Sequence, residues 1–122
     1  MADEALQRQQ GVIGVYIRVI SIIWQRLSPT FGIRTINAIA RNVIARKSAA
    51  YPALAYLRVG NDGLEWDGLL ANLGKLPEDQ VRLMLEEFLD EFFEALANLI
   101  GKIVVGKTFR EAAEMARKEG EE

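Results

Sequence analysis

The sequence predicts a mainly α protein, a small helical bundle of about four helices with one short β-hairpin near residues 53–67. In several long segments the apolar residues recur at steps of three and four, which is the spacing of a helix face. One glycine-rich turn signal separates two short stretches in which apolar and polar residues alternate. Half of the 122 residues are apolar and 26% are charged, as in packed globular proteins. We expect one domain over residues 1–122, with a frayed tail at 117–122.

Two helices are expected in the N-terminal part. From about Asp3 to Leu27, polar and small residues form one narrow stripe and apolar residues fill the rest of the circumference. A helix of this kind is buried on most sides. A second helix is expected to begin with Ser28 as its N-cap and Pro29 at its first position, and to run to about Lys47.

A turn region separates the second helix from the C-terminal half. The second helix is expected to end before Tyr51-Pro52, because the residue before a proline is pushed out of the helical region. The four residues from Gly60 to Gly63 are a strong hairpin turn signal between two alternating stretches. We therefore expect a short β-hairpin, and two short helices joined by a turn are the alternative.

Two further helices are expected after the hairpin. The first begins at Pro77 and carries a broad apolar face that includes several phenylalanines. A short final helix is expected after about Val105. Gly106 is expected to be the stop between the two, and Thr108 and Glu111 to form a capping box.

Residues 101–108, GKIVVGKT, match the phosphate-loop pattern G-x-x-x-x-G-K-[ST]. A working loop follows a buried strand, and its backbone N–H groups curl around the phosphates. Here the preceding segment has helical spacing, and three of the four intervening residues are β-branched. Only 14 residues follow Thr108, which leaves no room for further strands of a parallel sheet. We therefore expect no nucleotide and no other cofactor.

The composition argues against catalysis and against a metal site. There are no histidines and no cysteines, so the commonest general base, thiolate nucleophiles and the usual zinc ligands are missing. The acidic residues of the last long helix lie opposite its aromatic face, and we interpret them as a solvated surface. This acidic face comprises Glu86, Glu87, Asp90, Glu91 and Glu94. We expect neither a catalytic residue nor a metal ligand.

Charge is distributed unevenly along the chain. Residues 1–60 carry a net charge of +6, and residues 61–122 carry −8. We favour a structural interpretation, in which the basic and acidic halves face each other within one subunit or between two. In the alternative, a nucleic-acid-binding regulator, the candidate anion-contacting residues are Arg26, Arg34, Arg41, Arg46, Lys47 and Arg58. The overall pI near 5.3 argues against nucleic acid as a partner.

These observations favour a non-enzymatic helical interaction or regulatory module, of the kind used as adaptors in signalling, that self-associates as a homodimer. Two helices with wide apolar faces offer more apolar surface than a domain of this size readily covers. The candidate interface residues are Ile13, Ile17, Ile20, Trp24, Phe88, Phe92 and Phe93. A sensor that holds a small apolar ligand near Trp24 or Trp66 is a further alternative. We see neither a signal sequence nor a membrane-spanning segment, and we expect the protein in the cytoplasm.

Overall fold

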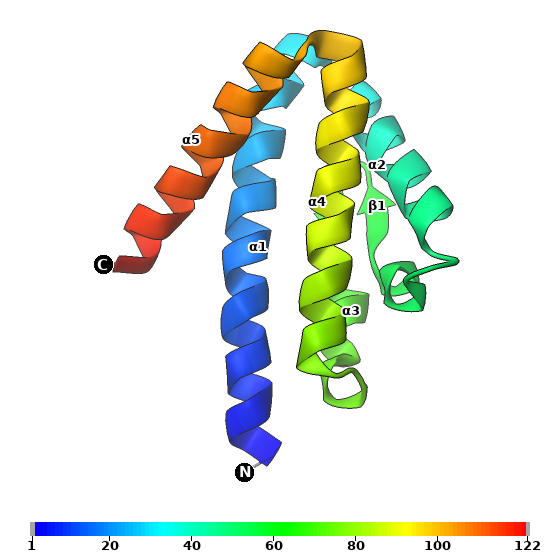
Figure 1. Ribbon diagram of the computed structural model, residues 1–122, viewed down its shortest axis with the longest axis vertical. Helices are drawn as coiled ribbons and strands as arrows, with labels where there is room; N and C mark the ends of the chain where they lie inside the picture. The colour runs from blue at the N-terminus through cyan, green and yellow to red at the C-terminus, as the bar shows by residue number, and fades with distance from the viewer. Residues whose placement is uncertain (1, 122) are drawn as a thin grey trace.

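The computed structural model describes the backbone of residues 2–121, and the side chains of residue 11 and residues 13–118. The described chain is mainly helical with one small hairpin, which confirms the predicted fold class (Figure 1). In chain order the elements are α1 (Ala2–Phe31), α2 (Ile33–Lys47), the 3-10 turn η1 (Pro52–Tyr56), β1 (Arg58–Gly60), β2 (Gly63–Glu65), α3 (Asp67–Ala71), the 3-10 turn η2 (Leu73–Lys75), α4 (Glu78–Ile100) and α5 (Lys102–Glu121).

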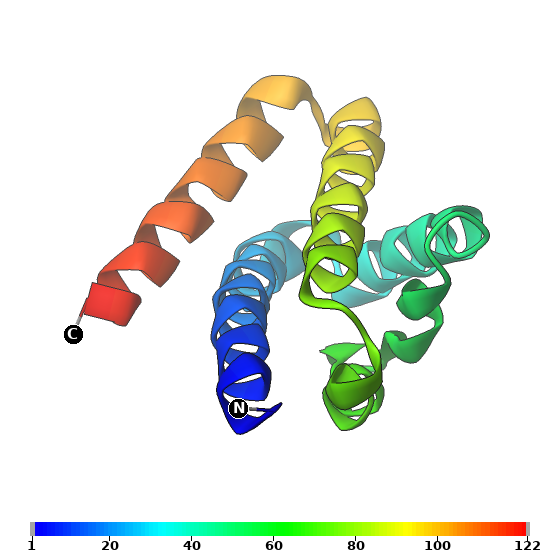
Figure 2. The same cartoon turned by 60° about the horizontal axis from the view of Figure 1, so that its bottom comes forward.

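The four long helices surround one apolar core. In Figure 1, α5 lies along one side of α1, α4 along the other, and α2 lies with the hairpin beyond α4. Figure 2 shows the same helices from the end at which α1 begins. The interior is filled by side chains from every long helix, among them Ile23, Val43, Phe88, Leu96 and Val105. Their burial agrees with the helical spacing of apolar residues in the sequence.

The hairpin is shorter than the alternating sequence pattern. β1 and β2 pair in antiparallel register, with Val59 opposite Leu64. The N-terminal part of the predicted hairpin, residues 53–56, forms the 3-10 turn η1 instead of a strand. Pro52 begins this turn, because its fixed φ suits the first position of a helical turn and it has no N–H to offer a strand partner.

The junction of α1 and α2 lies later in the chain than predicted. Ser28 and Pro29 belong to the last turns of α1, so the predicted N-cap at Ser28 was wrong. The Ser28 hydroxyl is buried and has no hydrogen-bond partner among the described residues. The break occurs at Gly32, whose φ of 85° suits glycine, and the Gly32 N–H donates to the Ser28 carbonyl at 2.8 Å. Pro29 is tolerated because it lies near the helix end, where it removes one intrahelical hydrogen bond.

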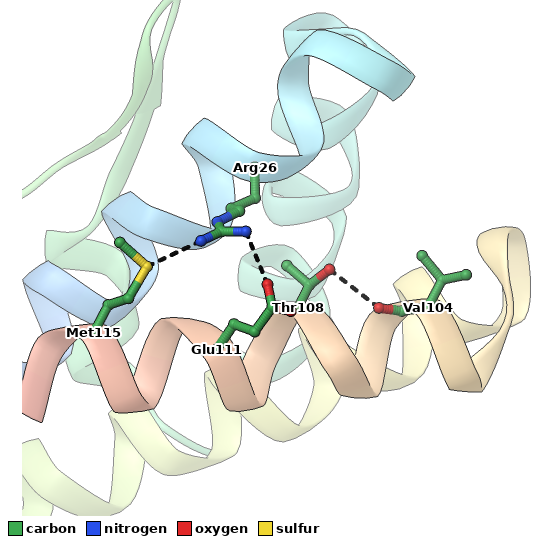
Figure 3. Close-up of polar contacts among 5 residues, drawn as sticks. All are labelled: Arg26, Val104, Thr108, Glu111 and Met115. Carbon is green, nitrogen blue, oxygen red and sulfur yellow. Dashed lines mark hydrogen bonds and ion pairs between the residues drawn. The ribbon is translucent and has the colours of Figure 1, made fainter.

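The junction of α4 and α5 is Gly101, with φ of 117°. Its N–H donates to the Ala97 carbonyl at 2.9 Å and closes the last turn of α4. Gly106 lies inside α5, so the predicted stop at this residue was wrong. The predicted capping box was wrong as well, because the Thr108 hydroxyl donates to the carbonyl of Val104 at 3.1 Å within the same helix (Figure 3). α5 is helical to Glu121, through most of the predicted tail, and residue 122 lies outside the described chain.

The two glycines near this junction should respond in opposite ways to alanine. Gly101→Ala should lower the free energy of unfolding by about 1 to 2 kcal/mol, because an L-residue at positive φ is strained. Gly106→Ala should raise it by up to about 1 kcal/mol, because alanine is the better helix former and a Cβ at this position meets open space. Urea unfolding followed by circular dichroism measures both changes. A shift of the same sign in both variants would contradict the placement of the junction.

Candidate functional site

Most of the predicted interface residues lie in the core of one chain. Ile13, Ile20, Phe88 and Phe92 are at most 2% exposed, and Trp24 is 6% exposed. The other two predicted residues, Ile17 and Phe93, are partly buried and pack against this core. The candidate interface residues are therefore covered largely by other parts of the same chain. An interface with a partner needs other apolar residues.

The aromatic residues of this set form a stack. The ring centroids of Trp24 and Phe92 are 4.9 Å apart, and those of Phe88 and Phe92 are 5.5 Å apart, both with nearly parallel planes. Phe109 joins from α5 and meets Phe93 edge-on, with the ring centroids 5.2 Å apart. The stack therefore ties α1, α4 and α5 together, and its function within the chain is structural.

Asn37 is the one buried polar residue within the described core. The Trp24 indole N–H donates to the Asn37 side-chain oxygen at 2.8 Å. The Asn37 amide in turn donates to the carbonyls of Gly60 and Asn61 at 3.0 and 3.1 Å, respectively. One side chain thus joins α1, α2 and the hairpin turn. The sequence places this residue only at the margin of a helix face, and no local signal indicates its partners.

Three basic residues of the N-terminal half, Arg26, Arg46 and Lys47, pair with acids of the C-terminal half. Arg26 on α1 contacts Glu111 on α5 at 2.8 Å (Figure 3). Arg46 and Lys47 at the end of α2 lie 3.5 Å from Glu91 on α4. Part of the basic half therefore faces the acidic half within one chain, which agrees with one form of the structural interpretation of the charge pattern.

The remaining candidate anion-contacting residues differ in their surroundings. Arg41 lies 3.5 Å from the carbonyl of Val59 on the hairpin. Arg34 and Arg58 are exposed and make no ion pair within the described part of the chain. The six cations therefore lie on three elements, α1, α2 and β1, and differ in their partners.

The acidic face of α4 is partly engaged by neighbours. Glu87 lies 3.5 Å from the Lys47 ammonium group, which also contacts Glu91. The Tyr16 hydroxyl of α1 lies 3.4 Å from a Glu86 carboxylate oxygen. Burial, followed by the negative charge of Glu86, raises the pKa of Tyr16 above its ordinary value. These carboxylates thus hold α1 and α2 against α4.

The segment that matches the phosphate-loop pattern is helical. Residues 102–108 form the first turns of α5, directly after Gly101. The Val105 N–H donates to the carbonyl of Gly101 at 3.2 Å, and the later N–H groups continue this helical pattern. A phosphate loop needs successive N–H groups that turn toward one point, and a regular helix aligns them along its axis instead.

Two surface patches carry exposed apolar side chains. The first, here called the corner patch, comprises Leu99, Ile103 and Val104 at the α4–α5 junction. The second, here called the Leu83 recess, is a hollow of about 380 Å³ between η1 and the start of α4. Leu83 is 49% exposed and lies in the wall of this recess. The recess is lined by Ala50, Tyr51, Pro52, Ala53, Gln80, Leu83 and Met84.

The region around Trp24, which the sequence suggests for a small ligand, has two surface depressions. One of about 200 Å³ lies toward the hairpin and includes Trp66 in its wall. The other, of about 470 Å³, is lined in part by Pro29 and Ile33. Trp24 itself is almost completely buried between them.

Comparisons with protein-family models, with curated proteins and with solved structures give no significant match. Among the described residues, no helix is both long and apolar enough to cross a membrane. The described residues form a small helical bundle with an apolar core, and apolar side chains are exposed at the corner patch and at the Leu83 recess, among other places.

Proposed function

We propose that the protein is a non-enzymatic cytoplasmic interaction module that self-associates as a homodimer through the Leu83 recess. The observation that carries this proposal is the half-exposed Leu83 side chain beside an apolar hollow whose lining residues carry no charge. A projecting leucine beside an uncharged hollow gives a partner's apolar side chain a place to pack.

The recess is suited to a second copy of the chain because it provides both a projecting side chain and a hollow that could receive one. A twofold interface uses the same patch on both subunits, so the patch must be complementary to itself. Here the projecting Leu83 and the hollow formed by Tyr51, Pro52 and Met84 lie side by side. Under twofold symmetry each leucine enters the hollow of the other copy. No like charges meet within the hollow itself, because its lining residues carry none.

The polar groups of the described chain support a function without catalysis. The buried amide of Asn37 is fully engaged with Trp24 and the hairpin. Several acids of α4 and α5 are paired with cations of α1 and α2. These groups are therefore used to hold the bundle together. A module of this kind acts by presenting a surface to its partner.

Leu83→Lys should convert the dimer to a monomer, because it places a charge in the apolar hollow and a second one opposite it. The matched control is Leu99→Lys, the same substitution at an exposed leucine near the other end of α4. Light scattering at micromolar concentration should give twice the chain mass of 13.7 kDa for the native protein and the control, and the single mass for Leu83→Lys. A monomeric native protein would overturn the proposal.

A further inference from the structure

The corner patch is the most exposed apolar feature of the described chain. Ile103 is 87% exposed, Leu99 is 62% exposed and Val104 is 49% exposed. The patch lies at one end of the long axis of the molecule, where α4 turns into α5 (Figure 1). The two helices meet there in a corner with only Gly101 between them. Aliphatic side chains therefore project outward from the end of the bundle.

Cations surround this patch. Lys102 precedes Ile103 in the first turn of α5, and Lys107 and Arg110 follow one and two turns later on the same side of the helix. All three side chains are exposed and make no ion pair within the described part of the chain. Lys102 and Arg110, together with Ile103 of the patch, also line an open hollow of about 440 Å³ whose other walls include Phe93 and Phe109.

No acidic residue interrupts this positive region in the sequence. Residues 95–110 contain three Lys or Arg and no Asp or Glu. The α1–α2 junction lies at the same end of the molecule, and residues 5–61 also contain no acid (Figure 1). Arg34, exposed at the start of α2, adds a further positive charge at this end. The charged side chains within these two ranges are therefore all positive, although the whole chain has a net charge of −2.

Two features favour a lipid surface over a second copy as the partner of the patch. A twofold contact would bring Lys102 and Lys107 of both copies together, which like-charge repulsion disfavours. Ile103 is 87% exposed beside the flanking cations, and such a side chain enters the acyl boundary of a bilayer while the cations stay at the headgroups. Aliphatic side chains flanked by Lys and Arg are typical of helices that bind at the surface of anionic membranes.

We propose that the corner patch docks on anionic lipid bilayers, with Leu99, Ile103 and Val104 entering the interface and the flanking cations contacting lipid phosphates. Each Lys or Arg near an anionic surface strengthens binding about fivefold. This inference goes beyond the proposed self-association and uses the opposite end of α4, so either proposal can fail without the other.

Co-sedimentation with vesicles tests the proposal. The native protein should sediment with phosphatidylcholine vesicles that contain phosphatidylglycerol, and much less with phosphatidylcholine alone. Binding should weaken strongly between about 0.1 M and about 1 M salt, as the Debye length falls from about 10 Å to about 3 Å. Ile103→Gln should weaken binding about fivefold through lost apolar insertion. Lys102→Gln combined with Lys107→Gln should weaken it more than twentyfold, at about fivefold for each cation.

Matched controls lie at the far end of the molecule. Leu70→Gln removes an exposed leucine of α3, and Lys75→Gln removes an exposed lysine of η2. Both variants should bind vesicles as the native protein does. The proposal is overturned if the native protein does not sediment with anionic vesicles, if the corner variants bind like the native protein, or if the controls lose as much binding as the corner variants. Circular dichroism checks that all variants are folded.

Discussion

Asn37→Ala should lower the free energy of unfolding by about 3 kcal/mol. The substitution leaves the Trp24 indole N–H and the carbonyls of Gly60 and Asn61 without their partner. Each buried polar group left unpaired costs about 1 to 3 kcal/mol, and the two carbonyls lie toward the surface, where water replaces part of the loss. A typical domain is stable by about 5 to 15 kcal/mol, so this single amide is a large part of the total.

Asn42→Ala is the matched control, because Asn42 is an exposed asparagine on the same helix. It should change stability by less than about 0.7 kcal/mol, in the stabilising direction, because alanine is the better helix former. Asn37→Asp separates the loss of hydrogen bonds from the loss of volume. It keeps the acceptor for Trp24 but turns a carboxylate toward two carbonyl oxygens, so it should destabilise at neutral pH at least as much as alanine does. Equal urea midpoints for Asn37→Ala and Asn42→Ala would refute the role of Asn37.

Phe92→Ala should lower the free energy of unfolding by about 4 kcal/mol, the usual cost of removing a fully buried phenylalanine. Phe92 lies at the centre of the aromatic stack, in contact with Trp24, Phe88 and Phe109. Its removal leaves a cavity where α1, α4 and α5 meet, and the surrounding rings can fill only part of it.

The neighbouring residue provides the control for this substitution. Phe93 is only partly buried and meets Phe109 edge-on at the side of the stack. Phe93→Ala should therefore cost about 1 to 2 kcal/mol. Chemical unfolding of both variants measures the difference. If the two losses are equal, the stack does not have Phe92 at its centre.

The helices could be predicted from the sequence, because their apolar residues keep a period that only a helix brings onto one side. The junctions between the helices were predicted less accurately than the helices themselves. Ser28-Pro29 and Thr108–Glu111 are strong local signals for a helix start, yet both lie inside helices. In each case the neighbouring turn packs against the core through a buried residue, Leu27 or Val105. Burial of that residue outweighs the capping preference, and the chain breaks at a nearby glycine instead.

The sites were harder to predict than the fold. Helical spacing shows that a face is buried and does not show what covers it, so Trp24 and Phe92 were assigned to an interface although the chain covers them itself. The bonds of Asn37 join residues 13 to 24 positions apart, and no local pattern encodes them. The corner patch depends on which of two glycines ends α4. If Gly106 had ended α4, Ile103 and Val104 would lie in its last turn and not at the α4–α5 corner.

Only one residue connects α1 to α2, Gly32, and only one connects α4 to α5, Gly101. The loops at these two corners therefore contain no spare residue. If the junction keeps its length, one extra residue at either corner moves every following residue by one helix position, which turns the apolar face by about 100° about the helix axis. At Gly101 that rotation would carry Val105 and Ala112 away from the core and bring polar side chains inward. The length of each helix thus determines the direction in which the apolar face of the next helix points. Between the two corners, a change of length is tolerated best where the chain is irregular, from the end of α2 to the start of α4.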